Sequence, residues 1–122
     1  MARILVVDDE TTTCRTIARL LRTEGHEASC ATGGTKALEQ LSNPQKPDLV
    51  ILDLMMPPPN GLDVLDAIRH DRRLLDVPVV IYTASSDPQV RQRALQMGAS
   101  DYVNKGLGWP ALYEQIEKLL PS

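Results

Sequence analysis

Cysteine is scarce in this chain: Cys14 and Cys30 are the only two, and neither stands at a metal-ligand spacing from a second Cys or a His. A disulfide framework and a zinc site are therefore excluded, and both residues are expected to be reduced core residues. No charge of one sign dominates, since 13 Lys and Arg face 16 Asp and Glu, and the net charge of −3 gives no general attraction to nucleic acid or anionic membranes. No apolar stretch approaches the ~18 residues of a membrane span, and no leader precedes the first apolar run. We expect a cytoplasmic protein without membrane insertion or direct nucleic-acid binding.

The length of the chain sets its domain organisation. With 122 residues, of which 43% are hydrophobic and 24% charged, the composition is that of one globular domain. A chain of this size can bury a core without disulfides or metals to hold it. We therefore predict a single domain over residues 1–122.

Two hydrophobic periods alternate five times along the chain. Runs of branched aliphatic residues predict strands at 4–7, 49–52 and 79–81, and weaker runs predict strands at 27–31 and 102–104. After each run, apolar residues recur at helical spacing, in five groups: Cys14, Ile17, Ala18 and Leu21; Ala37, Leu38 and Leu41; Leu62, Leu65 and Ile68; Val90, Ala94 and Met97; Leu112, Ile116 and Leu119. The alternation predicts an α/β fold, a three-layer sandwich around a parallel five-stranded sheet in the flavodoxin-like order 2-1-3-4-5.

Polar residues follow the predicted strands and would meet at one edge of this sheet. Asp8 and Asp9 follow the first strand, Asp53 the third and Lys105 the fifth, while Thr83 follows the fourth. Ligands bind beyond the carboxyl ends of such strands. Three carboxylates there repel one another and need a cation, and oxygen donors without His or Cys suit Mg²⁺. An aspartate can also accept a phosphoryl group, which the lysine and the threonine would contact, so metal and phosphate chemistry is the leading hypothesis.

Each of these residues has a simpler interpretation when it is taken alone. The acidic pair could cap a helix, the third aspartate could cap a loop, the threonine could merely end a strand and the lysine could be solvated. The joint pattern favours a site over these alternatives. His26 and His70 lie in polar segments away from the cluster and are expected to be surface residues.

Five motifs in order carry a resemblance to a known family. They are Asp8 and Asp9 in VVDDE; Asp53 in LDLMMPPPNG; Met56, Pro57 and Gly61 after it; Thr83 with Ala84; and Gly98, Ala99, Asp101, Tyr102 and Lys105. From Arg3 to Leu120 the chain resembles the receiver domain of two-component response regulators, of the chemotaxis-regulator type.

The resemblance implies a phosphorylation site. Asp53 would accept a phosphoryl group from the phosphohistidine of a sensor histidine kinase or a phosphotransfer protein. Mg²⁺ would be held by Asp8, Asp9, Asp53 and the backbone carbonyl of Met55, with Asp9 the more direct ligand of the pair. Lys105 would pair with the phosphate. The domain would catalyse only its own phosphorylation and dephosphorylation.

The resemblance also implies a conformational switch. Thr83 would be drawn toward the phosphate and Tyr102 would move inward, which remodels the face formed by the fourth helix, the fifth strand and the fifth helix. Leu95, Trp109 and Tyr113 fall outside the core stripes, so we expect them to contact a partner on that face. Met55 and Ser85, two residues past the phosphoacceptor and the threonine, would flank the hydrolytic water and set the lifetime of the acyl phosphate.

The sequence departs from the family in two places. Receivers usually follow the lysine with proline, often through a cis bond, whereas Lys105 precedes Gly106. We predict a trans bond here, a more mobile loop over residues 106–109, and a lysine held by its charged partners more than by its backbone. The run Pro57 to Pro59 should stiffen the loop after the phosphorylation site.

Other functions remain open at this stage. A haloacid-dehalogenase-like phosphatase would need a second Asp where Met55 stands, and a flavodoxin-like nucleotide carrier would need a phosphate loop where the acidic pair stands. A degenerate receiver could act only as a protein-interaction module. The chain ends at Ser122 soon after the last predicted helix. We therefore expect a single-domain regulator with a protein target, or a receiver excised from a longer protein with an output domain, as a monomer or a weak phosphorylation-dependent dimer.

Overall fold

Five parallel strands form one sheet in the order β2-β1-β3-β4-β5 in the computed structural model, which describes residues 1–120. The strands are β1 Arg3–Val7, β2 Glu27–Ala31, β3 Leu49–Leu52, β4 Val79–Thr83 and β5 Asp101–Asn104. The helices are α1 Thr11–Thr23, α2 Gly34–Leu41, α3 Gly61–Arg69, α4 Pro88–Gln96 and α5 Gly108–Leu119, with short 3-10 turns η1 Arg72–Leu74 and η2 Lys105–Leu107. The predicted fold class and strand order are confirmed, while Pro121 and Ser122 of the predicted domain lie outside the described residues.

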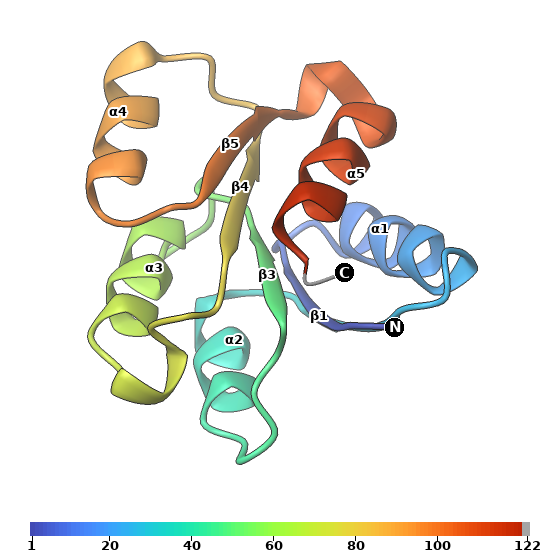
Figure 1. Ribbon diagram of the computed structural model, residues 1–122. Helices are drawn as coiled ribbons and strands as arrows, with labels where there is room; N and C mark the ends of the chain where they lie inside the picture. The colour runs from blue at the N-terminus through green and yellow to red at the C-terminus, as the bar shows by residue number, and fades with distance from the viewer. Residues whose placement is uncertain (121–122) are drawn as a thin grey trace.

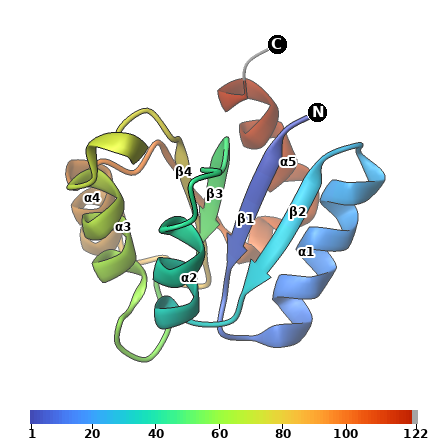
Figure 2. The ribbon, with the colours of Figure 1, turned by 90° about the horizontal axis from the view of Figure 1, so that it is seen from below.

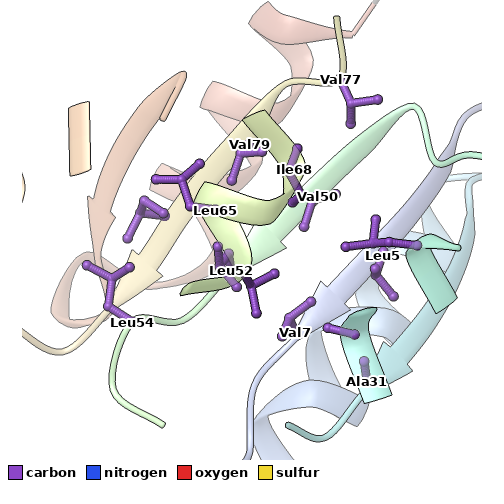
Figure 3. Close-up of a cluster of buried hydrophobic side chains, with 14 of the residues drawn as sticks. Leu5, Val7, Ala31, Val50, Leu52, Leu54, Leu65, Ile68, Val77 and Val79 are labelled. Carbon is purple, nitrogen blue, oxygen red and sulfur yellow. The ribbon is translucent and has the colours of Figure 1, made fainter. Parts of the chain in front are cut away.

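The helices cover both faces of the sheet. Figures 1 and 2 show α2, α3 and α4 on one face and α1 and α5 on the other. Successive residues of β1 point to opposite faces, so Leu5 and Val7 join the core under α2 and α3, while Ile4 and Val6 join the core under α1 and α5. Figure 3 shows the first of these cores. Burial on both faces explains why the strongest strands contain no polar alternation. None of the helices within residues 1–120 is long and apolar enough to cross a membrane.

The start of α3 is fixed against the end of β3. Asn60 and Asp63 form a reciprocal capping box, in which the Asn60 side chain accepts from the Asp63 N–H (3.0 Å) and the Asp63 carboxylate accepts from the Asn60 N–H (2.8 Å). At Gly61 a Cβ atom would clash with the backbone carbonyl of Asp53 and would lie 2.5 Å from the Cα of Leu54. Only glycine allows α3 to begin this close to the strand end.

Gly61→Ala is therefore expected to destabilise the domain by about 2–3 kcal/mol, because both neighbours of the new methyl group are backbone atoms that cannot move away. Urea denaturation measures the loss. Gly25→Ala is the control, since a Cβ there would meet nothing within 4 Å and only the backbone φ of +93° opposes it, at about 1 kcal/mol. Equal losses in the two variants would contradict the close approach at Gly61.

Candidate functional site

The carboxyl ends of the central strands bring three aspartates together. Asp8 directly follows β1 and Asp53 directly follows β3, which pairs with β1. The sheet hydrogen bonds continue one residue past each strand, because the Asp8 N–H donates to the Ala31 carbonyl (3.1 Å) and the Asp53 N–H donates to the Val7 carbonyl (3.0 Å). One carboxylate oxygen from each of Asp8, Asp9 and Asp53 lies within 4.8 Å of the others. The predicted acidic cluster is present.

The cluster places an amine beside two buried carboxylates. Asp8 and Asp53 are 3% and 5% exposed, whereas Asp9 is exposed. Lys105 Nζ lies 2.7 Å from Asp8 Oδ2 and 3.2 Å from Asp53 Oδ2, so the lysine side chain bridges the ends of two strands. Three carboxylates and one ammonium leave two negative charges in excess at the site. Hard oxygen donors with this excess charge fit a divalent ion such as Mg²⁺.

Burial and charge shift the titration of this cluster. Burial raises the pKa of Asp8 above its usual value and the Asp53 charge adds to the effect, although hydrogen bonds from Lys105 and from the Glu10 backbone N–H act in the opposite direction. Burial alone would lower the pKa of Lys105, but its contacts with Asp8 and Asp53 outweigh burial and raise it. The lysine therefore stays charged, but it does not neutralise all the negative charge of the three carboxylates.

Thr83 brings a hydroxyl group to the end of β4, which lies on the opposite side of β3 from β1. It ends β4, the neighbour of β3, and its side chain is fully buried. Within residues 1–120, Thr83 Oγ1 is the buried side-chain oxygen or nitrogen that has no hydrogen-bond partner. An unpaired buried hydroxyl costs folding free energy, so the Thr83 hydroxyl is available to donate a hydrogen bond at this end of the sheet.

One family of known proteins matches most of this sequence. The sequence model of the response regulator receiver domain matches residues 4–117. The chain belongs to the response regulator receiver family.

Relatives and solved structures agree with this assignment. The DNA-binding response regulator MtrA of Mycolicibacterium paratuberculosis is 41% identical over 103 residues, which cover 84% of this chain and 44% of MtrA. The phosphate regulon transcriptional regulatory protein PhoB of Klebsiella pneumoniae is 33% identical over 118 residues, covering 97% of this chain and 51% of PhoB. The chain thus spans about half the length of these relatives. The response regulator TrrA of Thermotoga maritima, solved in complex with Mg²⁺-BeF, has a TM-score of 0.86 at 36% identity, covering 98% of this chain and 100% of TrrA. The chemotaxis protein CheY4 of Vibrio cholerae has a TM-score of 0.90 at 25% identity, covering 98% and 99%.

The loop after Asp53 brings Met55 beside the receiver site. The Met55 N–H donates to Asp53 Oδ1 (3.1 Å), and the Met55 side chain is 60% exposed. The Met55 backbone therefore contacts Asp53 of the acidic cluster, while its flexible apolar side chain is exposed. The peptide between Pro58 and Pro59 is cis, a feature of this loop that the sequence analysis missed.

The segment between β4 and α4 is held by two residues of β5. The Tyr102 hydroxyl donates to the Ser85 carbonyl at 2.8 Å, and the Asn104 side-chain N–H donates to the same carbonyl at 3.3 Å. Tyr102 is half-buried and packs against the core under α2 and α3. Asn104 was missed by the sequence analysis, although Asn is a preferred residue at the start of a helical turn.

The end of β5 differs in part from the expectation. The Lys105–Gly106 peptide is trans, as predicted. The prediction of a loop over residues 106–109 is wrong: η2 follows β5 directly and α5 begins at Gly108. The physical reason is the Asn104 side chain, which accepts from the Gly106 N–H at 2.7 Å and so caps η2. The lysine does contact its charged partners, but its backbone is also ordered into a turn.

Three expectations about aromatic and histidine residues need correction. Trp109 and Tyr113 lie one turn apart on α5 and stack with ring centroids 5.1 Å apart, and both pack against the core under α1 and α5. The Tyr113 hydroxyl lies 3.4 Å from His26 Nε2, in the segment between α1 and β2. These two aromatic residues therefore face α1 and not the face of α4 and β5, where Leu95 is half-buried on α4.

His26 is itself half-buried and accepts from the Ala2 N–H (3.1 Å), whereas His70 is exposed as predicted.

The cysteines match the sequence analysis except in burial. Both are free thiols, as predicted. Cys14 is fully buried and its thiol contacts the Val6 carbonyl at 3.3 Å. Cys30 is only half-buried, because β2 is an edge strand with one neighbour.

Proposed function

We propose that this receiver domain accepts a phosphoryl group on Asp53 from the phosphohistidine of a sensor histidine kinase or a phosphotransfer protein. The position of Asp53 carries the proposal. Its strand, β3, lies between β1 with the acidic pair and β4 with Thr83, and its carboxylate contacts Lys105. Asp53 thus lies between the strand followed by the acidic pair, which would bind the metal, and the strand that ends in Thr83, and it contacts Lys105. The metal and the lysine would neutralise the charge of a phosphoryl group on Asp53, and Thr83 would donate to it.

The transfer exchanges one bond to phosphorus for another. An Asp53 carboxylate oxygen attacks the phosphorus, a P–O bond forms, and the P–N bond breaks with its electron pair leaving on the histidine ring. Asp8, Asp9, Asp53 and the Met55 carbonyl would hold Mg²⁺, which when bound neutralises charge on the phosphoryl oxygens. Lys105 pairs with one of these oxygens and Thr83 donates to another.

Loss of the phosphoryl group occurs at the same site. Water attacks the phosphorus of the acyl phosphate, and the carboxylate of Asp53 leaves. Met55 and Ser85 stand beside this path and set the lifetime of the phosphorylated state. The bond from the Met55 N–H to Asp53 Oδ1 and the exposure of the Met55 side chain support this role. The chain would catalyse these two reactions on itself and on no other substrate.

Thr83 and Tyr102 would convert phosphorylation into a change of surface. A Thr83 hydroxyl that turns toward the phosphoryl group pulls on the segment between β4 and α4. The Ser85 carbonyl in that segment accepts a hydrogen bond from the Tyr102 hydroxyl, so the Tyr102 side chain must readjust when the segment moves. This would remodel the face formed by α4, β5 and α5, on which a protein partner binds.

Partners follow from the same proposal. MtrA and PhoB are about twice as long as this chain, and MtrA is named as DNA-binding. For this chain we propose a downstream target that is a separate protein or an output domain beyond the residues given, with no direct nucleic-acid contact by the receiver itself. The cytoplasm, where response regulators generally act, is the proposed location.

A degenerate receiver that acts only by protein contact is the main alternative. It would use the same fold and need no phosphate. The unpartnered Thr83 hydroxyl favours phosphorylation, because it makes no bond that stabilises the fold, and Lys105 already places a cation beside Asp53. The exposed Met55 stands where a haloacid-dehalogenase-like phosphatase would carry its second aspartate, which disfavours that enzyme class.

Incubation with acetyl phosphate and Mg²⁺ is expected to add one phosphoryl group per chain, because Asp53 is the carboxylate that faces both the acidic pair and Lys105. Intact-mass spectrometry at neutral pH, before the acyl phosphate hydrolyses, measures the addition. The same incubation with EDTA in place of Mg²⁺ is the control and should give no product. An unchanged mass with Mg²⁺, or full modification in EDTA, would contradict the proposal.

A further inference from the structure

Asn104 forms a small bonded unit with the residues around Lys105. In the sheet it pairs with Thr83 of β4, and it immediately precedes Lys105. Its side-chain oxygen accepts from the Gly106 N–H at 2.7 Å, and its side-chain nitrogen donates to the Ser85 carbonyl at 3.3 Å. One side chain thus ties the turn that holds the lysine to the segment that follows Thr83.

The turn itself has little else to define it. η2 contains three residues, and its own backbone closes through the bond from the Gly108 N–H to the Lys105 carbonyl. At Gly106 a Cβ would lie 3.0 Å from Asn104 Oδ1, so the glycine gives the Asn side chain room to reach over the turn. Proline at this position would have no N–H to donate. The cap therefore needs both residues, because Asn104 supplies the acceptor oxygen and Gly106 supplies the N–H.

The position of the lysine depends on this turn. Lys105 has a flexible four-carbon side chain, and its ammonium group must reach both Asp8 and Asp53 across the end of β4. A small rotation of the turn at the Lys105 Cα would move the ammonium group away from at least one carboxylate. A hydrogen bond that fixes the turn before any phosphoryl group arrives would lower the cost of aligning the lysine.

We infer that Asn104 is a positioning residue for the phosphorylation reaction: its side-chain cap on the Gly106 N–H holds Lys105 over Asp53. The inference rests on the proposed function, since it assigns Asn104 a part in that reaction. Asn104 does not touch the reacting atoms and acts only through Lys105.

The test compares two variants of nearly equal shape. Asn104→Val removes the acceptor, whereas Asn104→Thr keeps a hydroxyl oxygen that can accept from the Gly106 N–H, and both suit the end of a strand. With acetyl phosphate and saturating Mg²⁺, Asn104→Val is expected to lower the maximal phosphorylation rate constant about fivefold, the worth of one hydrogen bond. Asn104→Thr should recover most of that loss. The half-saturating Mg²⁺ concentration should stay within about twofold in both, because the aspartates are untouched.

Asn43 offers a matched control outside the site. Its side-chain oxygen also accepts from the N–H two residues on, that of Gln45, at 3.0 Å on an exposed segment. Asn43→Val removes the same kind of bond and should leave the phosphorylation rate unchanged. Hydrogen exchange of the Gly106 amide gives a second readout, which should be slow in the parent and in Asn104→Thr and faster in Asn104→Val.

Each outcome decides something. Equal rates in the parent, Asn104→Val and Asn104→Thr would overturn the inference and leave the proposed function standing. Equal losses in Asn104→Val and Asn104→Thr would also overturn it, because the acceptor oxygen would then not matter. If Asn104→Val melts too low to assay, Asn104→Ala replaces it. A parent that is not phosphorylated would overturn the proposed function, and the inference with it, whatever the amide exchange shows.

Discussion

Lys105→Met is expected to slow phosphorylation of Asp53 about 100-fold, the usual effect of removing one charge-stabilising donor from a transfer site. Methionine keeps the length of the side chain and loses the ammonium group that lies within 3.2 Å of both buried aspartates. In Mg²⁺-free buffer the same change should also destabilise the fold, by about 2 kcal/mol. That is less than the usual cost of unpairing a buried charge because the lysine side chain is partly exposed. Phosphorylation rates and urea denaturation measure the two effects.

Lys118→Met is the matched control for this prediction. Lys118 pairs with Glu114 at 3.5 Å on the exposed surface of α5, where an ion pair contributes little. Lys118→Met should therefore leave the phosphorylation rate unchanged. A phosphorylation rate in Lys105→Met close to that of the parent would show that the lysine does not act on the phosphoryl group.

Mg²⁺ is expected to stabilise the unphosphorylated domain, because it relieves the repulsion among Asp8, Asp9 and Asp53, which come together only in the folded chain. At a tenfold excess over its dissociation constant the gain is about 1.4 kcal/mol, or roughly 5 °C in melting temperature for a domain of this size. Thermal unfolding at several Mg²⁺ concentrations and constant ionic strength measures the shift.

Asp9→Asn should abolish most of this gain, since Asp9 is the exposed carboxylate of the cluster and no lysine within residues 1–120 pairs with it. Asp76→Asn, an exposed aspartate in the segment before β4, is the control and should keep the full Mg²⁺ effect. A melting temperature of the parent that does not respond to millimolar Mg²⁺ would count against the metal site.

The sequence was sufficient to predict the sheet and the cluster of charged residues for a simple reason. Strands buried on both faces must be apolar throughout, so β1, β3 and β4 stand out from their surroundings. Once the strand order is known, the residues that follow each strand must converge, which brings Asp8, Asp53 and Lys105 together without further information. The pattern of apolar residues therefore predicted both the sheet and the charged cluster.

The errors lie where a side chain has more than one partner within reach. Trp109 and Tyr113 fall outside the core stripe of α5, but the stripe does not say whether such residues turn toward α1 or toward α4, and here the contact with His26 decides it. Gly106 suggested a mobile loop, because glycine is flexible. The segment is ordered instead by a cap from the Asn104 side chain, which the glycine itself does not reveal. A cap is a local bond, but its second contact, to Ser85, depends on the pairing of β4 and β5.

Identifying the phosphorylated carboxylate tests the central claim most directly. After incubation with acetyl phosphate and Mg²⁺, borohydride reduces the acyl phosphate and turns the modified aspartate into homoserine, which tandem mass spectrometry of peptides locates. We predict homoserine at position 53 and at neither Asp8 nor Asp9, and no homoserine in Asp53→Asn treated in the same way. Homoserine at position 8 or 9, or a phosphorylated parent that yields none at position 53, would contradict the account.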